Sequence, residues 1–359
     1  MPLKKDKNKL RRITFCEAVR EATLQAMERD DSVLLLGLGV TDPKGVFGTT
    51  LGLKERFGKE RVYDIPVSEN AVTGIAVGLA ISGFRPILSH QRADFMLMSM
   101  DQIINNSAKW NYMFGGQSSV PLVIRTIIGR GWGQGPQHSQ NFQAMFAQVP
   151  GLKVVSPTTP YQAKGLMAAA IEDPDPIVFV EHRWLHGQVG DVPENYYSIP
   201  IGKAQVMKPG QDLTIVTSLD MTVEALNIAE KLKSQNIDIE VVDLCSVKPL
   251  DEETILTSVN KTGRLLVIDS SWKDFGVAAQ VTAFVAEKEH GRLKCAIRRM
   301  GLPDIPSPST PALSKNYYPR AKDICLVVED MLGKKLNLNV FEDEKLPHDV
   351  PDPFFKGPF

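Results

Sequence analysis

The sequence has few cysteines, no long hydrophobic run and almost no excess of charge. Its 359 residues include only 4 cysteines, and the formal net charge is −1. Cys16, Cys245, Cys295 and Cys325 form no CxxC pair and no Cys/His spacing of a metal site. No segment has the length of a membrane span, and the first residues lack the apolar core of a signal peptide. We therefore expect a soluble cytoplasmic protein with reduced thiols and no membrane partner.

Other recurrent functional patterns are also missing. A near-zero net charge gives no electrostatic basis for binding nucleic acid. The basic run between Lys4 and Arg12 contains no aromatic residues and is typical of a solvated tail. The chain has no Walker loop, dinucleotide-binding fingerprint, EF-hand or zinc-finger spacing. Nucleic-acid binding and these ligand classes are therefore not expected.

Short apolar runs alternate with helical patterns through most of the chain. Continuous apolar runs at 33–36, 121–128 and 176–181 predict strands that are buried on both faces. Amphipathic or small-residue patterns at 13–29, 70–82 and about 95–109 predict helices. This alternation predicts an α/β fold with a mostly parallel sheet covered by helices on both sides.

The rhythm is interrupted once, which indicates two domains. Residues 183–211 are rich in Gly, Pro, Tyr and Asn, and the alternation of strands and helices resumes after them. We predict a first doubly wound domain at 13–185, a connection at 186–211 and a smaller α/β domain at 212–333. The proline-rich tail at 334–359 lacks an apolar pattern of its own and is expected to lie on another surface or to be partly disordered.

Glu69 is the first candidate functional residue. It follows a short strand and a proline turn and precedes a helix of small residues that includes Gly74 and Gly78. If the carboxyl group is buried there, desolvation raises its pKa and suits it to proton exchange. The alternative is a carboxylate that stabilises the helix N-terminus, with Ser68 as the cap.

Two further polar segments follow predicted strands, at the edge where α/β sheets bind ligands. His90, Arg92 and Asp94 form one cluster, which is otherwise a surface loop with local ion pairs. The glycine-rich loop at 129–136 leads to His138, which we expect to begin a helix and to stay neutral. A structural histidine is the alternative for His138.

Carboxylates and aromatic residues near the end of the first domain form a third group. Asp173 and Asp175 flank Pro174 in what reads as a helix-ending turn. Glu181 and His182 end the next strand, and Trp184 and His186 follow at a position from which they could close a site.

An ordered set of motifs resembles the beta subunits of thiamine-diphosphate-dependent 2-oxo acid dehydrogenases, in the transketolase-like superfamily. The motifs extend through residues 13–332 and include Ser68-Glu69, Gly83-Phe84-Arg85-Pro86, Asp101-Gln102-Ile103-Ile104-Asn105, Gln137-His138-Ser139-Gln140 and the run from Pro150 to Pro157. The resemblance implies a pyrimidine-binding domain followed by a transketolase C-terminal domain.

The resemblance also assigns roles to individual residues. Glu69 takes the position of the carboxylate that binds the aminopyrimidine ring of thiamine diphosphate, and Phe95 that of the aromatic stacked on this ring. His90 and Arg92 fall near the cofactor, and His138 matches a histidine that serves the 2-oxo acid and the lipoyl acceptor. Asp173 and Asp175 occur where relatives hold a structural monovalent cation, such as K⁺.

A missing motif implies a partner. The Gly-Asp-Gly motif that holds diphosphate and Mg²⁺ in these enzymes is not present in this sequence. The resemblance therefore implies a separate alpha subunit that carries them, an α2β2 heterotetramer, and inactivity of this chain alone. A lipoyl acyltransferase core is a further implied partner.

Two departures from the family pattern leave the substrate open. Leu38 and Gly39 replace an acidic pair after the first strand, and His90 to Ala93 are polar where relatives are apolar. Pyruvate or a branched 2-oxo acid is the leading substrate class. The alternatives are a split transketolase-like carboligase that acts on a polar or sugar-like substrate without a lipoyl partner, and a non-catalytic subunit.

Overall fold

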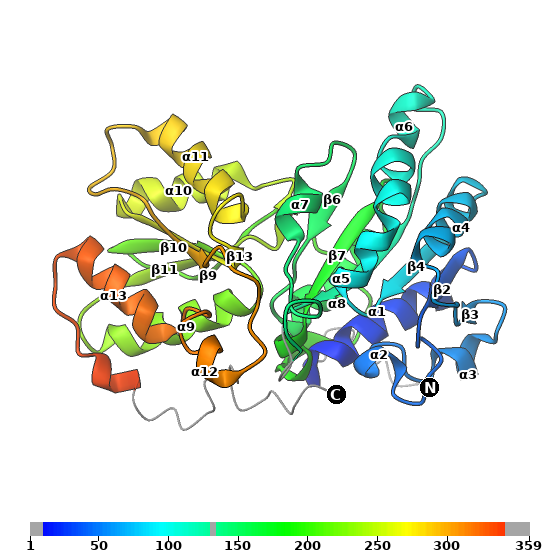
Figure 1. Ribbon diagram of the computed structural model, residues 1–359, viewed down its shortest axis with the longest axis horizontal. Helices are drawn as coiled ribbons and strands as arrows, with labels where there is room; N and C mark the ends of the chain where they lie inside the picture. The colour runs from blue at the N-terminus through cyan, green and yellow to red at the C-terminus, as the bar shows by residue number, and fades with distance from the viewer. Residues whose placement is uncertain (1–9, 130–133, 342–359) are drawn as a thin grey trace, which may run out of the picture.

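The computed structural model describes residues 10–129 and 134–341, which form two α/β domains that lie side by side (Figure 1). The first domain contains β1 Leu10–Thr14, α1 Phe15–Arg29, β2 Val33–Gly37, α2 Gly45–Gly48, α3 Leu53–Phe57, β3 Val62–Tyr63, α4 Glu69–Ile81, β4 Arg85–His90, α5 Ala93–Met96, a 3-10 helix Leu97–Ser99, a π-helix Gln102–Ser107, α6 Trp110–Met113, β5 Val123–Ile128, α7 Gln143–Ala147, β6 Lys153–Val155, α8 Pro160–Glu172, β7 Ile177–His182, a 3-10 helix Arg183–Gly187 and β8 Val189–Pro193. The second contains β9 Gln205–Lys208, β10 Leu213–Thr217, α9 Asp220–Lys233, β11 Ile239–Asp243, β12 Ser246–Lys248, α10 Glu252–Thr262, β13 Leu265–Trp272, α11 Val277–Glu289, β14 Arg298–Leu302, α12 Pro311–Ser314, α13 Ala321–Leu332 and a 3-10 helix Leu338–Phe341.

The first sheet has the order β12-β6-β7-β5-β4-β2-β3. Its edge strand β12 comes from the second part of the chain and is antiparallel to β6, and all other strands are parallel. The second sheet has the order β14-β13-β10-β11-β9, with only β9 antiparallel. Central strands such as β2, β5 and β10 are buried along their whole length. The predicted fold of two mostly parallel, doubly wound domains is therefore confirmed.

The predicted helix at 13–29 shows how closely local signals specify an element. Thr14 caps α1, and its hydroxyl accepts a hydrogen bond from the Glu17 N–H while the Glu17 carboxylate accepts one from the Thr14 N–H. This reciprocal pair satisfies two N–H groups that have no partner within the helix. The apolar side of α1 is buried and packs against α8.

The helix predicted at about 95–109 is present over most of that range, but it is not a continuous α-helix. After α5 the chain forms a 3-10 helix and then a π-helix before α6 begins. Asn105 and Asn106 donate side-chain hydrogen bonds to Asp101 and Gln102, one turn earlier. The π-helix is a local departure from regular α geometry, and the spacing of apolar residues does not predict where such a departure occurs.

The predicted connection at 186–211 contains a strand of each domain. β8 pairs with β1 in a small antiparallel sheet, whereas β9 extends the second sheet along β11. Both strands are short and partly exposed, so they lack the continuous apolar pattern of the central strands. A shared apolar core continues from the first domain into one face of the second sheet, and α9 and α13 cover the other face.

None of the helices within residues 10–129 and 134–341 is long and apolar enough to cross a membrane.

Candidate active site

Glu69 is the first residue of α4, and its carboxylate makes no hydrogen bond or ion pair that involves the described part of the chain. The side chain of Ser68, the predicted cap, accepts no hydrogen bond from the first N–H groups of the helix. Glu69 is only partly exposed, although it lies at the edge of the domain. A half-buried acceptor without a partner is more typical of a ligand contact than of a capping residue.

The start of α4 packs against the segment that carries Phe95. The Thr73 hydroxyl is hydrogen-bonded to the Glu69 carbonyl at 2.7 Å and to the Ser99 hydroxyl at 2.9 Å. Thr73 follows Glu69 by about one turn, and Ser99 follows Phe95 by about one turn. The structure thus holds Glu69 and Phe95 on two adjacent segments.

Phe95 and His138 lie in direct contact. Their ring centroids are 5.2 Å apart and the ring planes are perpendicular. Phe95 is 37% exposed, so one side of its ring remains open to a stacking partner. His138 lies in a turn rather than at a helix N-terminus, because α7 begins only at Gln143. The prediction that His138 begins a helix is therefore wrong.

Asp94 and Gln140 are bonded beside this ring contact. The Gln140 side-chain amide donates to Asp94 Oδ1 at 2.7 Å. Partial burial raises the pKa of Asp94, and the hydrogen bond from Gln140 opposes that rise. The sequence placed both residues next to predicted site residues but gave no sign that they pair across two loops.

His90 and Arg92 are buried in the interior of the first domain. Arg92 is 4% exposed and donates to the Gly129 carbonyl at 2.9 Å and to Gln134 Oε1 at 2.6 Å. Burial, followed by the nearby Arg183 charge, lowers the pKa of Arg92 to about 10. Burial also lowers the pKa of His90 to about 4, so its ring is neutral. These contacts use Arg92 to hold the base of the glycine-rich loop, of which residues 130–133, including Arg130 and Trp132, lie outside the described structure.

The predicted cation site is filled by a lysine. Lys153 Nζ donates to both carboxylate oxygens of Asp173 at 2.8 Å and lies 3.0 Å from Asp175 Oδ2. The Arg85 guanidinium donates to the carbonyls of Ile171 and Asp173. Both carboxylates and the nearby carbonyls are therefore already paired with cationic groups, and the residues do not fit a K⁺ ion.

A buried ion pair joins the neighbouring strands β5 and β7. The Arg125 guanidinium donates to the two carboxylate oxygens of Glu181 at 2.7 and 3.1 Å, and His186 Nε2 lies 3.2 Å from the same carboxylate. Burial alone would raise the pKa of Glu181, but Arg125 and His186 hold it well below its ordinary range. His186 stacks on Phe15 and is buried, so it supports the strand ends and does not close a site.

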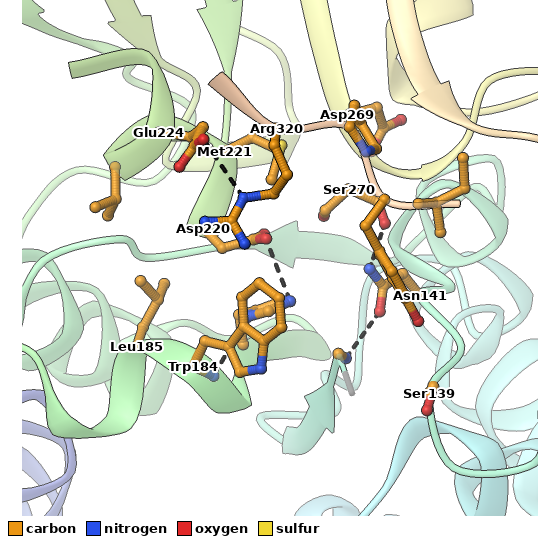
Figure 2. Close-up of a pocket in the computed structure, with 16 residues that line it drawn as sticks. Ser139, Asn141, Trp184, Leu185, Asp220, Met221, Glu224, Asp269, Ser270 and Arg320 are labelled. Atoms are coloured by element: carbon orange, nitrogen blue, oxygen red, sulfur yellow. Dashed lines mark hydrogen bonds and ion pairs between the residues drawn. The ribbon is translucent and has the colours of Figure 1, made fainter. Parts of the chain in front are cut away.

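A small cavity lies behind the glycine-rich loop, between the two domains (Figure 2). The Asn141 side chain links the two domains. Its Oδ1 accepts a hydrogen bond from the Gly129 N–H, and its Nδ2 donates one to the Ser270 carbonyl. His182 and Asp220 face each other at 3.5 Å, and Trp184 lines the same space. Gly129 has φ +81°, and a Cβ there would meet the His182 ring. The cavity has a volume of about 40 Å³ and is lined by residues of both domains.

The chain matches two domain families in order. Residues 11–188 match the pyrimidine binding domain of transketolase, and residues 202–324 match the transketolase C-terminal domain. The acetoin:2,6-dichlorophenolindophenol oxidoreductase beta subunit of Cupriavidus necator is 42% identical over 324 residues, covering 88% of this chain and 96% of that protein. The pyruvate dehydrogenase E1 beta subunit of Rickettsia bellii is 41% identical over 317 residues, covering 88% and 98%. The 2-oxoisovalerate dehydrogenase beta subunit of Bacillus subtilis is 40% identical over 307 residues, covering 85% and 94%.

The chain belongs to the beta-subunit family of thiamine-diphosphate-dependent 2-oxo acid dehydrogenases.

A solved structure has the same architecture as this beta subunit. The chain resembles a split gene transketolase, determined as an inactive beta4 tetramer, with a TM-score of 0.72 over 90% of this chain and 100% of that one. The sequences are 24% identical, so this likeness concerns the fold alone.

The residues at the edge of this beta subunit fit one end of thiamine diphosphate. An unpartnered carboxylate, Glu69, and a half-open aromatic ring, Phe95, offer an acceptor and a stacking surface to a planar aminopyrimidine. The described residues contain no group of three or more His, Cys, Asp or Glu side chains that could hold a metal ion. These groups thus fit the aromatic end of the cofactor, and nothing comparable on the described chain fits Mg²⁺.

Proposed function

We propose that this chain is the beta subunit of an enzyme that decarboxylates a small 2-oxo acid and passes the acyl group to a lipoyl acceptor. The observation that carries the proposal is the half-site formed by the Glu69 carboxylate and the Phe95–His138 ring contact. High identity over nearly the full length of three kinds of beta subunit supports the reaction class.

Each residue of the half-site has a distinct chemical task. Thiamine diphosphate, when bound, would supply a carbon nucleophile and an electron sink for the decarboxylation. Glu69 holds a proton at the pyrimidine ring nitrogen, and Phe95 fixes the ring plane by stacking. His138, next to Phe95, holds or delivers a proton at the reacting carbonyl oxygen and at the acceptor sulfur.

An alpha subunit completes the site and holds the diphosphate and Mg²⁺. The absence of a Gly-Asp-Gly motif supports this division. Exposed apolar side chains in this part of the first domain support it further: Ile75 on α4 is 57% exposed, Met98 is 69% exposed and Tyr112 on α6 is 89% exposed. Figure 1 shows α4 and α6 at the outer end of the first domain, away from the second. Apolar surfaces of this kind mark protein interfaces, and we propose an α2β2 assembly.

The burial of His90 and Arg92 favours a 2-oxo acid over a sugar-like substrate. The carboligase alternative depends on these polar residues facing the substrate, whereas Arg92 is bonded to Gly129 and Gln134. Four free thiols among the described residues suit a reducing compartment, and we propose a cytoplasmic enzyme that docks on a lipoyl acyltransferase core.

Assay of the chain with an alpha subunit that carries Gly-Asp-Gly tests the proposal. The two chains are co-produced and supplied with thiamine diphosphate, Mg²⁺ and pyruvate, a branched 2-oxo acid or acetoin. We expect reductive acylation of a lipoyl domain from a 2-oxo acid. If acetoin is turned over and neither 2-oxo acid is, the proposed reaction is wrong and the enzyme cleaves acetoin. Transfer of a two-carbon unit to a sugar or aldehyde without acylation would support the carboligase.

A further inference from the structure

The two segments that carry the half-site are joined close to His138 by an amide–carboxylate bond, in addition to the bonds of Arg92 to Gly129 and Gln134. One segment, the short helix α5 after β4, presents Asp94 and Phe95. The other, after β5, presents His138 and Gln140. Gln140 Nε2 donates to Asp94 Oδ1 at 2.7 Å, and the rings of Phe95 and His138 meet next to this bond.

The backbone around His138 is weakly held. The His138 N–H reaches the Gly135 carbonyl at only 3.4 Å, a long hydrogen bond, and His138 lies in an irregular turn. Anchors further along the chain are stronger: Asn141 is bonded to Gly129 and Ser270, and Gln143 to Asp269. Gln140, which is bonded to Asp94, therefore lies in the sequence between His138 and the firmly anchored Asn141.

We propose that Asp94 and Gln140 are positioning residues that keep His138 in edge contact with Phe95, and so set where the imidazole lies relative to the reacting atoms. The inference rests on the proposed function of His138. A charged acceptor strengthens the bond, and partial burial protects it from competition by water. Neither residue needs to touch the substrate, because a small misplacement of a reacting group is costly by itself.

Conservative and disruptive variants separate this role from a structural one. Asp94→Asn keeps an acceptor for Gln140, whereas Asp94→Leu and Gln140→Leu remove the bond. In the assembled enzyme we expect the leucine variants to lower kcat by about 10²-fold, with the melting temperature and the affinity for thiamine diphosphate unchanged. Asp94→Asn should stay within about threefold of wild type. The double leucine variant should be no worse than either single variant, because both remove the same bond.

Glu172→Leu is the matched control, since this carboxylate also accepts a side-chain bond, from Tyr196, at the end of α8. It should leave kcat unchanged. Hydrogen exchange of residues 137–142 gives a readout that does not need turnover: exchange should accelerate in Asp94→Leu but not in Asp94→Asn. No turnover by the wild-type assembly would refute the proposed function and leave this exchange test intact. Wild-type kcat in Asp94→Leu, an Asp94→Asn variant as slow as Asp94→Leu, or additive losses in the double variant would overturn the positioning role.

Discussion

The His138 imidazole stands edge-on to the Phe95 ring, with centroids 5.2 Å apart and an interplanar angle of 90°. Phe95 lies in α5, which follows β4, and His138 lies in the loop that follows β5, and these two strands are parallel neighbours. Parallel pairing brings the carboxyl ends of both strands to one edge of the sheet. The ring that we propose to stack on the cofactor and the imidazole that we propose to serve the substrate are thereby joined in one contact.

Replacement of His138 by Asn should affect acyl transfer to the lipoyl acceptor more strongly than decarboxylation. An amide keeps much of the shape but cannot exchange a proton, and general acid–base groups contribute about 10²–10⁴-fold to rates. We expect transfer to the lipoyl acceptor to fall by about 10²-fold or more. Decarboxylation measured with an artificial electron acceptor should fall less. Equal activity of wild type and His138→Asn in both assays would contradict the role of this ring.

Ile75→Glu should block assembly with the alpha subunit. The exposed apolar side chain on α4 would be replaced by a charge, which is costly to bury in an interface. Sedimentation of the mixed subunits should show affinity weakened by more than about tenfold, with the fold of the isolated chain unchanged. Leu326→Glu on α13, at a similarly exposed position of the second domain, is the control. Normal assembly of Ile75→Glu would place the alpha subunit elsewhere.

Exchange of K⁺ for Na⁺ or choline should change neither activity nor melting temperature. Lys153 already neutralises Asp173 and Asp175, so no ion is needed at this turn. Lys153→Met should lower the free energy of unfolding by about 1 kcal/mol, whereas the exposed Lys59→Met should not. A requirement for K⁺ in the wild-type enzyme would show that a cation binds at a different position.

Acid should destabilise the chain through Glu181. Arg125 and His186 keep the pKa of this carboxyl group below its ordinary value of 4.5. Because the folded pKa is lower than the unfolded one, the stabilisation is complete above about pH 4.5 and is lost as the pH falls further. Urea unfolding should show this loss in wild type.

Glu181→Gln should cost about 3–5 kcal/mol at pH 7, since it leaves the buried Arg125 charge without its partner. The paired replacement Arg125→Met with Glu181→Leu should recover most of that loss. Unfolding of Glu181→Gln that matches wild type at both pH 7 and pH 4 would rule out this contribution.

Sequence patterns predicted the central strands well and the irregular parts poorly. The apolar runs that form β2, β5, β7 and β10 are long enough to be read directly, and Thr14 with Glu17 marks the start of α1. Short edge strands such as β8 carry no such pattern. The π-helix is determined by side-chain bonds and by contact with α4, which no local signal reports.

The candidate site shows the same division. The motifs proposed Glu69, Phe95 and His138 as site residues, and these assignments stay predictions, whereas the partners of the charged residues could not be predicted at all. Arg92 turned out to be bound to the loop base and Asp173 to Lys153, through contacts that span 37 and 20 residues of sequence. Long-range partners of this kind depend on the packing of the sheet, so the sequence alone left the Arg92 and Asp173 side chains free to bind ligands.

The most direct test of the account is calorimetric titration of thiamine diphosphate with Mg²⁺ into this chain, into the alpha subunit and into their mixture. We predict binding at a complete site only in the mixture, because each chain supplies one end of the cofactor site. Glu69→Gln, with Glu60→Gln as an exposed control, should assemble normally and abolish turnover. Full-affinity binding by this chain alone, no binding by the assembled mixture, or undiminished turnover in Glu69→Gln would contradict a cofactor site shared between two subunits.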